Sequence, residues 1–208
     1  MEQNTRIYPV IKRILDLVFS SVALVILSPV LLITALVVYV KLGSPILFTQ
    51  KRPGKNQRIF KLYKFRSMSI STSDVIQIDD EERLSRFGSL LRSTSLDELP
   101  SLWNIAKGDM SFVGPRPLLV EYLSRYSERQ QIRHQVRPGL TGLAQASGRN
   151  LVPWAERLEL DVQYVETYSA KVDFQIICNS LALVLTRKGT TAPGNATMPE
   201  FTGESFPR

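Results

Sequence analysis

The most prominent feature of the hydrophobic pattern is a run of 24 uncharged residues from Leu17 to Val40. A helix of that length, at about 1.5 Å per residue, could cross a hydrocarbon core of roughly 30 Å. Ser28 and Pro29 lie at its centre, where proline removes a backbone hydrogen bond and bends the helix. Because the serine hydroxyl can partly satisfy the freed carbonyl, such a bend is tolerable in lipid.

Basic residues flank this run on both sides. Three precede it, eight follow it, and no acidic residue lies between Lys41 and Arg66. Basic flanks favour the cytoplasmic side, and a straight span would put one of them on the opposite side. We therefore expect a re-entrant hairpin over residues 1–45 that enters the membrane, bends at Ser28-Pro29 and returns. A kinked full span is the alternative.

The pattern beyond residue 45 predicts a compact cytoplasmic domain over 46–188. We expect short strands at 46–50 and 58–65, separated by a turn at Pro53-Gly54. Helical spacing of apolar residues predicts helices at 79–91, 96–106, 118–136, 154–168 and 172–186. The tail over 189–208 is rich in Gly, Pro and Thr, so it is expected to lack regular structure. The predicted fold class is α+β, mostly helical with a few short strands.

Composition narrows the possible functions. The chain of 208 residues has one cysteine, Cys178, and one histidine, His134, which excludes a disulfide framework and multi-histidine metal sites. Cys178 is expected in the core, and His134 is expected to be structural or exposed. Residues 1–66 hold 11 basic and 2 acidic side chains, whereas the remainder holds 15 and 17. The basic excess therefore belongs to the membrane segment and the strands beside it.

Two adjacent carboxylates, Asp97 and Glu98, lie in the segment RSTSLDELP over 92–100. Ser95 and Glu98 have the spacing of a capping box, which would place both acids in the first turn of a helix. Alternatively Asp97 is itself the N-cap, and Pro100 then takes the third helical position. In both arrangements the helix dipole and free amides favour negative charge there. The pair is either a plain cap or part of a functional site.

The segment Gly114-Pro115-Arg116-Pro117 is a second candidate. Prolines on both sides hold the backbone nearly rigid, so the guanidinium of Arg116 has little conformational freedom to lose on binding phosphate oxygens. Arg137, Gln145 and Arg149 follow among glycines that allow tight turns, which is a weaker signal for the same chemistry.

Basic and apolar residues alternate over 61–66, as in a strand with one solvated face. Lys64 and Arg66 on this segment could bind anionic lipid heads, nucleic acid or a nucleotide diphosphate. No recognisable nucleic-acid module accompanies them, so lipid or lipid phosphate is the expected partner and nucleic acid is not.

Three stretches are similar to those of a known family: TSLDELP at 94–100, GDMSFVGPRP at 108–117 and PGLTGLAQ at 138–145. With the Ser28-Pro29 break and ATMPEF at 196–201, they resemble bacterial sugar transferases, the monotopic phosphoglycosyl transferases. The resemblance extends from Val10 to about Leu185, and the compact length is similar to small members such as undecaprenyl phosphate N,N′-diacetylbacillosamine 1-phosphate transferases. Leu143 and Ala146-Ser147 depart from residues that are frequent there.

The resemblance implies transfer of a sugar 1-phosphate from a UDP-sugar to polyprenol (undecaprenyl) phosphate with release of UMP. This is the first membrane step of glycan assembly. Asp97 would be the nucleophile and would hold Mg²⁺ together with the diphosphate, and Glu98 would act as a base or as a second metal contact. The implied substrate-binding residues are Arg92, Pro115, Arg116, Pro117, Lys64, Arg66, Arg137, Gln145 and Arg149.

The same resemblance implies a place on the cytoplasmic face of the bacterial inner membrane, with downstream glycosyltransferases as partners. The residues alone leave two other functions open. One is a non-enzymatic adaptor that binds anionic lipid, for which Asp97 and Glu98 would be dispensable. The other is a membrane-tethered nucleic-acid binder, which would release no UMP.

Overall fold

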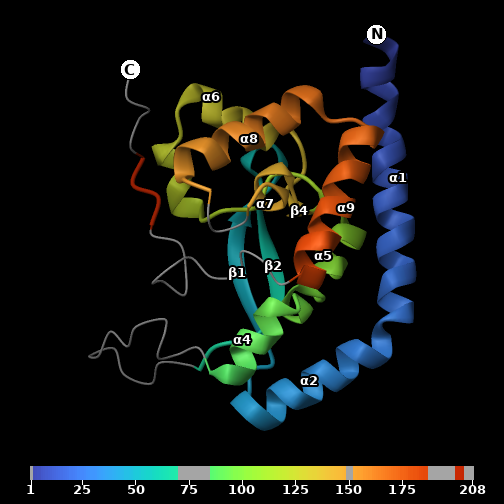
Figure 1. The fold of residues 1–208 in the computed structure, drawn as a ribbon, viewed down its shortest axis with the longest axis vertical. Helices are drawn as coiled ribbons and strands as arrows, with labels where there is room; N and C mark the ends of the chain where they lie inside the picture. The colour runs from blue at the N-terminus through green and yellow to red at the C-terminus, as the bar shows by residue number, and fades with distance from the viewer. Residues whose placement is uncertain (1, 70–84, 149–151, 187–199, 204–208) are drawn as a thin grey trace.

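The computed structural model describes residues 2–69, 85–148, 152–186 and 200–203, and helices predominate in it (Figure 1). The α-helices are α1 (Glu2–Ile26), α2 (Ser28–Leu42), α4 (Arg86–Ser93), α5 (Ser101–Lys107), α6 (Glu128–Gln131), α7 (Leu143–Ala146), α8 (Trp154–Thr167) and α9 (Ala170–Thr186). The 3-10 helices are η1 (Lys55–Gln57), η2 (Leu96–Glu98), η3 (Val120–Arg125) and η4 (Ile132–Gln135). The strands are β1 (Leu47–Pro53), β2 (Ile59–Phe65), β3 (Ser111–Val113) and β4 (Gly139–Thr141). The predicted α+β class, mostly helical with short strands, is confirmed.

The long apolar run forms a bent helix pair. α1 and α2 meet at Leu27 with a bend of 63°. Pro29 lies in the first turn of α2, where its missing N–H costs nothing, and the Ser28 hydroxyl donates to the Val25 carbonyl at 2.8 Å. The predicted break at Ser28-Pro29 is thus confirmed. No single helix among the described residues is long and apolar enough to cross a membrane alone, but the bent pair together passes that test of length and composition.

Each helix of the pair packs one face against the rest of the chain. Ala23 and Leu24 of α1, together with Leu27 at the bend, pack against buried residues of β2 and α5. On α2, Val38 is fully buried beside Phe65 of β2. The opposite faces expose large apolar side chains, which include Ile14, Val18, Phe19, Val22, Val25 and Ile26 of α1 and Leu32, Ile33, Leu36 and Val40 of α2.

Polar side chains also fix α1 to α5 and α9, which lie beside it in Figure 1. Arg13 donates to the carbonyls of Ile105 and Ala106 at 2.7 and 2.8 Å, and so satisfies the open end of α5. Asp173 of α9 accepts a hydrogen bond from Tyr8 at 2.6 Å and forms an ion pair with Lys12. The amino-terminal half of α1 is therefore positioned by residues that lie 92 to 165 positions away in the sequence.

β1 and β2 form an antiparallel hairpin in which Leu47 is opposite Phe65. The predicted strands and the turn at Pro53-Gly54 are confirmed, although β1 extends to Pro53, three residues beyond the predicted end. Two consecutive turn residues, Asn56 and Gln57, have left-handed backbone conformations with φ of 53° and 61°. The parallel pair β3 and β4 escapes sequence-based prediction, because a strand of three residues shows no clear alternation.

The single helix predicted over 118–136 is wrong. Three short helices, η3, α6 and η4, cover this segment. The backbone of Tyr126 is extended, with ψ of 137°, and Ser127 starts a new helix through a capping box with Gln130. The periodic apolar residues therefore belong to separate elements, and Tyr122 and Tyr126 meet in one cluster with Leu118.

The two preceding helices begin later than predicted. α4 starts at Arg86 with Ser85 as its N-cap, and residues 79–84 of that prediction lie outside the described residues. The helix predicted over 96–106 is the turn η2 followed by α5. Pro100 has no N–H to donate to the Leu96 carbonyl, so a regular α-helix cannot begin at Leu96.

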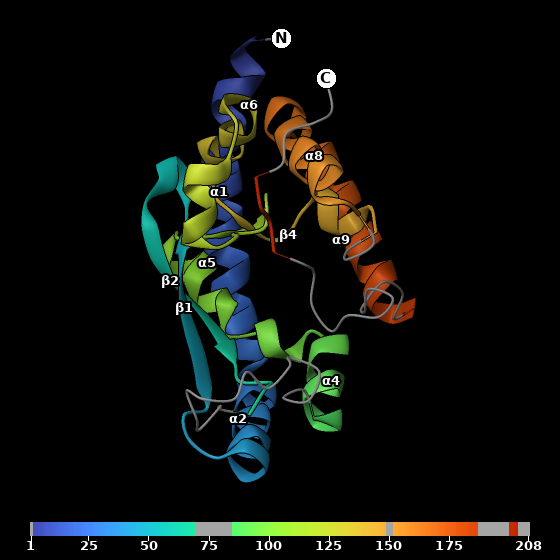
Figure 2. The same ribbon diagram turned by 90° about the vertical axis from the view of Figure 1, so that its left-hand side faces the viewer.

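α8 and α9 confirm two predicted helices to within two residues at each end. In Figure 2 they lie on one side of the molecule and β1 and β2 on the other, with β4 between them. Cys178 is exposed on α9 beside Phe174 and Leu181, so its predicted core position is wrong. The helix directs Asp173 and Ile176 inward instead, because a helix has one buried face only.

Of the predicted irregular tail over 189–208, residues 200–203 are described, and they form no helix or strand. Phe201 is buried within 6 Å of the rings of Tyr122, Tyr126 and Trp154. The boundaries of the predicted domains, at 45 and 188, stay a prediction.

Candidate active site

Asp97 and Glu98 lie in η2, between α4 and α5. Neither predicted cap forms, because the Ser95 side chain accepts no capping hydrogen bond and α5 begins after Pro100 without a side-chain cap. Ser95 has a left-handed backbone with φ of 58°, a conformation that costs about 1–2 kcal/mol in a residue with a Cβ. The chain thus turns sharply just before the two carboxylates and brings Glu98 to Lys64 of β2.

Glu98 is held between two cations. Its Oε1 accepts a hydrogen bond from Lys64 Nζ at 2.6 Å and one from Arg116 at 2.7 Å. Burial alone would raise the pKa of Glu98, but Arg116 and Lys64 together hold it well below its ordinary value. Glu98 is therefore ionised at neutral pH and is a weak proton acceptor.

Asp97 is in a different state from its neighbour. Its side chain is buried and has no hydrogen bond or ion pair with any described residue. Burial and the charge of Glu98 raise the pKa of Asp97 to about 6, against the opposing effect of Lys64, Arg116 and Arg92. Such a carboxylate is mostly ionised at pH 7 and more basic than an ordinary aspartate. Asp97 is thus the carboxylate available for chemistry.

Buried polar side chains hold α5 against β2. The Asn104 amide donates to the Lys61 carbonyl at 2.7 Å, and its oxygen accepts from the Tyr63 N–H at 3.1 Å. The Ser101 hydroxyl donates to the Tyr63 carbonyl at 2.8 Å. Ser101 and Asn104 therefore pair the backbone groups on the edge of β2 that β1 does not cover. This bonding fixes η2, and with it Glu98, relative to the strand that carries Lys64.

Arg116 is supported from behind by a buried ion pair. Its backbone carbonyl accepts a hydrogen bond from Arg133 at 2.7 Å. Arg133 pairs with Asp161 of α8 at 2.7 Å, and the two side chains are 2% and 3% exposed. The Pro115 carbonyl accepts from the Gly139 N–H at 3.0 Å, which joins this segment to β4. These contacts add to the stiffness that Pro115 and Pro117 confer on the backbone.

Arg92 is the remaining predicted cation close to the carboxylate pair. Its Nε donates to the Ser67 hydroxyl at 3.0 Å, and its charge lowers the pKa of Asp97. The structure thus brings together two acidic and three basic candidates, namely Asp97, Glu98, Lys64, Arg92 and Arg116.

Three other candidates make contacts within the scaffold. Arg66 donates to the carbonyls of residues 42–44 and so closes the end of α2, because the last carbonyls of a helix need donors. Arg137 donates to the Gly108 carbonyl at 2.9 Å, and Gln145 donates to the Leu140 carbonyl at 3.0 Å. None of the three contacts the carboxylate pair, and Arg149 lies outside the described residues.

Two cations near Arg116, Arg52 of β1 and Arg157 of α8, were missed by the sequence patterns. Burial and the charge of Arg116 lower the pKa of each to about 10. Arg157 lies over the Trp154 ring at 5.2 Å, and Arg52 has no acidic partner among the described residues. Arg52 could have been found from the alternation of side chains between the two faces of the hairpin, because this alternation places Arg52 on the same face as Lys64.

Comparison with known proteins identifies the family. A sequence model described as bacterial sugar transferase matches residues 7–187. The uncharacterized sugar transferase EpsL of Bacillus subtilis (strain 168) is 45% identical over 195 residues, which cover 93% of this chain and 96% of EpsL.

Two further relatives differ in length. The exopolysaccharide production protein ExoY of Rhizobium meliloti (strain 1021) is 35% identical over 86% of this chain and 87% of its own. A Klebsiella pneumoniae protein named UDP-glucose:undecaprenyl-phosphate glucose-1-phosphate transferase is 40% identical over 81% of this chain, which spans only 38% of that relative. Since the matches extend over nearly the whole sequence and include the segments that form the site, this chain belongs to the bacterial sugar transferase family.

Proposed function

We propose that this protein transfers a sugar 1-phosphate from a UDP-sugar to polyprenol phosphate, such as undecaprenyl phosphate, and releases UMP. The names of two relatives support the acceptor: the Klebsiella glucose-1-phosphate transferase and an undecaprenyl-phosphate galactose phosphotransferase of Salmonella typhimurium. The observation that carries the proposal is Asp97, a buried carboxylate that has no partner among the described residues, has a pKa of about 6 and lies next to cations that suit a diphosphate.

The proposed reaction has two displacements at the same phosphorus. A carboxylate oxygen of Asp97 attacks the sugar-side phosphorus, the bond from this phosphorus to the bridging oxygen breaks, and UMP leaves with that oxygen. An oxygen of the polyprenol phosphate then attacks the acyl phosphate, and the Asp97 carboxylate is regenerated as the polyprenol diphosphosugar forms. With a dianionic acceptor neither displacement transfers a proton, so the chemistry requires no general base.

We assign Glu98 a positioning role on this basis. Its two ion pairs make it a weak base, and they hold the ends of Lys64 and Arg116 together at one point. These cations, with Arg92, would offset the repulsion between the Asp97 carboxylate and an anionic donor. The ion pairs thus weigh against the base that the family resemblance allows for Glu98.

Magnesium fits this site as an ion shared with the substrate. Within residues 2–69, 85–148, 152–186 and 200–203, no group of three or more His, Cys, Asp or Glu side chains could hold a metal alone. Mg²⁺ is usually bound through one or two carboxylates together with substrate phosphates, and Asp97 has free oxygens for this purpose. When bound, the ion would neutralise charge on the diphosphate.

We further propose that the outer faces of α1 and α2 insert into the cytoplasmic leaflet of the bacterial inner membrane. The inner faces pack against β2 and α5 even next to the bend, at Leu24 and Leu27. A straight span would therefore carry parts of the catalytic domain into the bilayer, where their polar backbone edges are costly. This placement would bring the head of an embedded polyprenol phosphate to the site.

A labelling experiment tests this membrane placement. Because Cys178 is exposed, Cys178→Ser is made first, and Gln3→Cys and Ser44→Cys are then introduced separately. Both new thiols are expected to react with an impermeant maleimide in inside-out vesicles and to be protected in right-side-out cells. Reaction of the two thiols from opposite sides would contradict the re-entrant arrangement.

The pH dependence of the first displacement follows from the pKa of Asp97. Protonation removes the nucleophile, so formation of the covalent adduct should rise with pH around an apparent pKa near 6 and level off above about pH 7. Glu98→Gln removes a charge that raises this pKa and frees two cations that lower it, so the profile should move to lower pH. Rapid-quench measurement of the adduct checks both, and an unmoved profile in Glu98→Gln would contradict the assignment.

The overall proposal is tested by measuring UMP. Detergent-solubilised protein is incubated with polyprenol phosphate, Mg²⁺ and a wide panel of UDP-sugars. At least one sugar is expected to give UMP and a lipid-linked sugar in equal amounts. A complete absence of UMP across the panel would count against the transferase and in favour of the membrane adaptor.

A further inference from the structure

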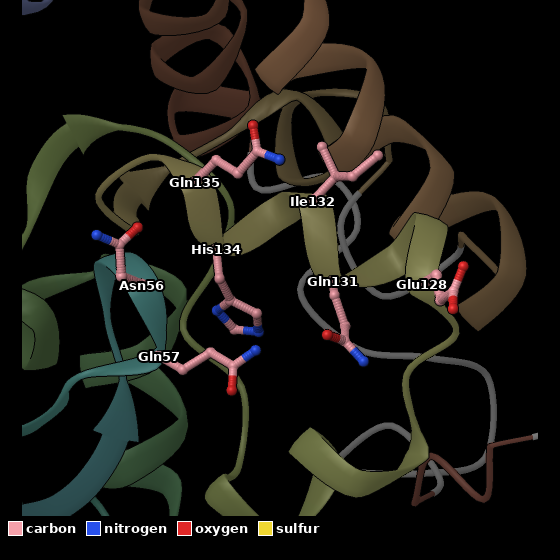
Figure 3. Close-up of a pocket in the computed structure, with 7 residues that line it drawn as sticks. All are labelled: Asn56, Gln57, Glu128, Gln131, Ile132, His134 and Gln135. Carbon is pink, nitrogen blue, oxygen red and sulfur yellow. The ribbon is translucent and has the colours of Figure 1, made fainter.

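A polar pocket lies where the turn of the β1–β2 hairpin meets α6 and η4 (Figure 3). Its volume of about 370 Å³ falls within the usual range of ligand pockets, about 300–1,000 Å³. Seven residues line it, namely Asn56, Gln57, Glu128, Gln131, Ile132, His134 and Gln135. All except Ile132 are polar, and none is a lysine or an arginine, so the lining differs from that of the cationic site around Arg116.

His134 forms the buried part of this lining. It is 6% exposed, and its Nε2 has no hydrogen-bond partner in the part of the chain that the structure describes. The other ring nitrogen bonds to the backbone of Gly54, but burial and the charge of Arg133 lower the pKa of His134 to about 4. The ring is therefore neutral at pH 7, and Nε2 is an acceptor without a donor. Leaving a buried acceptor unpaired costs about 1–3 kcal/mol, so a ligand that donates there gains by pairing it.

Flexible amide side chains surround the histidine. In Figure 3 the side chains of His134, Gln57 and Gln131 extend into the same space from η4, η1 and α6. The turn that presents Gln57 has an unusual backbone, since Asn56 and Gln57 both have positive φ. Amides supply donors and acceptors alike, whereas His134 and Glu128 supply acceptors only.

The chemistry of the lining selects a class of ligand. A phosphate or carboxylate would meet Glu128 without a compensating cation, and an apolar ligand would leave the amides and Nε2 unpaired. A compound with several hydroxyl groups can donate to His134 and Glu128 and accept from the glutamines. We propose that this pocket binds a neutral, hydroxyl-rich ligand of monosaccharide size.

This site is separate from the one proposed for the UDP-sugar. Lys64 lies five positions after Ile59, which is next to the turn, and in extended β2 this corresponds to about 17 Å at ~3.3 Å per residue. None of the five residues gathered around Asp97 lines the pocket. The inference therefore goes beyond the proposed function and adds a second carbohydrate site.

The pocket also has a structural route to the active site. His134 lines a small second cavity together with Pro115, Arg116 and Pro117. Its neighbour Arg133 donates to the Arg116 carbonyl. A ligand that fixes His134 would therefore fix the backbone that carries Arg116.

Saturation-transfer NMR on the full chain in detergent tests the proposal, with N-acetylglucosamine, glucose and galactose as probes. At least one sugar is expected to bind saturably with a Kd on the order of 1 mM. Gln57→Ala and Gln131→Ala are exposed substitutions that preserve folding, and each should weaken binding about tenfold. Gln163→Ala, an exposed glutamine on α8, is the matched control and should bind as the unaltered protein does.

Two further arms separate this site from the active site. Asp97→Asn should bind the sugar normally, and excess UDP should not displace the sugar from the unaltered protein. Both results are expected even if the unaltered protein releases no UMP with any donor. His134→Asn keeps a donor for Gly54, removes the Nε2 acceptor and should weaken binding. The proposal is overturned if no probe binds up to ~10 mM, ten times the expected Kd, if the glutamine substitutions leave binding unchanged, or if UDP competes.

Discussion

Asp97→Asn is expected to lower UMP release by about 10³-fold or more. An amide oxygen has the same shape as a carboxylate oxygen but is a far weaker nucleophile, so the acyl-phosphate intermediate cannot form. The packing around residue 97 should be preserved, because Asp97 has no hydrogen-bond or ion-pair partner to lose among the described residues. UMP release at saturating donor and acceptor measures the effect.

Intact-protein mass spectrometry gives a second, independent readout of the same variant. With UDP-sugar and no acceptor, the unaltered protein should gain the mass of one sugar phosphate, and Asp97→Asn should gain none. Glu121→Gln, which neutralises an exposed carboxylate in η3, is the control and should form the adduct at the normal rate. Normal turnover by Asp97→Asn would contradict the nucleophile assignment.

The sequence does not show why the adjacent carboxylates Asp97 and Glu98 differ in their partners and in their pKa values. The DELP segment marks both acids, and the helix-capping argument treats them alike. Their difference arises from Lys64 and Arg116, which are 34 and 18 residues away from Glu98 and both bond to its Oε1. The sequence therefore identifies the two acids, while the pairing that leaves Asp97 free depends on tertiary contacts.

Local patterns predicted the long elements well and the site scaffold poorly. The bend at Ser28-Pro29, the β1–β2 hairpin and α8 each follow from strong local signals, namely proline, alternation and helical periodicity. The segment 118–136 has helical periodicity too, yet Ser127 provides a cap that divides it. Apolar spacing alone cannot distinguish one long helix from short helices that face the same cluster.

Arg66 illustrates a different limit of predicting binding residues from the sequence. Its place in a basic strand suggests an anionic ligand, but its two terminal nitrogens donate to the carbonyls at the end of α2. Helix ends create a demand for donors that is invisible until the helix and the strand are seen side by side. Arg52, near the turn of the same hairpin, is the opposite case, since the alternation places it on the same face as Lys64 and its charge interacts with that of Arg116, although no motif includes it.

Asp161→Asn is expected to lower the free energy of unfolding by about 3–5 kcal/mol. The substitution leaves the Arg133 guanidinium charged and almost fully buried, because its side chain is 2% exposed and Asp161 is its ion-pair partner. For a chain of this size, about 1 kcal/mol corresponds to about 2–4 °C, so Tm should fall by roughly 10 °C. Thermal unfolding in detergent, followed by tryptophan fluorescence, measures the change.

A double variant separates stability from the support of Arg116. Arg133→Met combined with Asp161→Leu removes both charges. Because burial opposes the ionisation of both groups, the Tm of this double variant should be well above that of Asp161→Asn. The Arg116 carbonyl nevertheless loses its donor, so the guanidinium that meets Glu98 is less well fixed. The double variant should therefore release UMP about tenfold more slowly than the unaltered protein, because one lost hydrogen bond to a charged group costs roughly 1.5 kcal/mol. Full activity in a thermally stable double variant would show that Arg133 holds α8 in place without positioning Arg116.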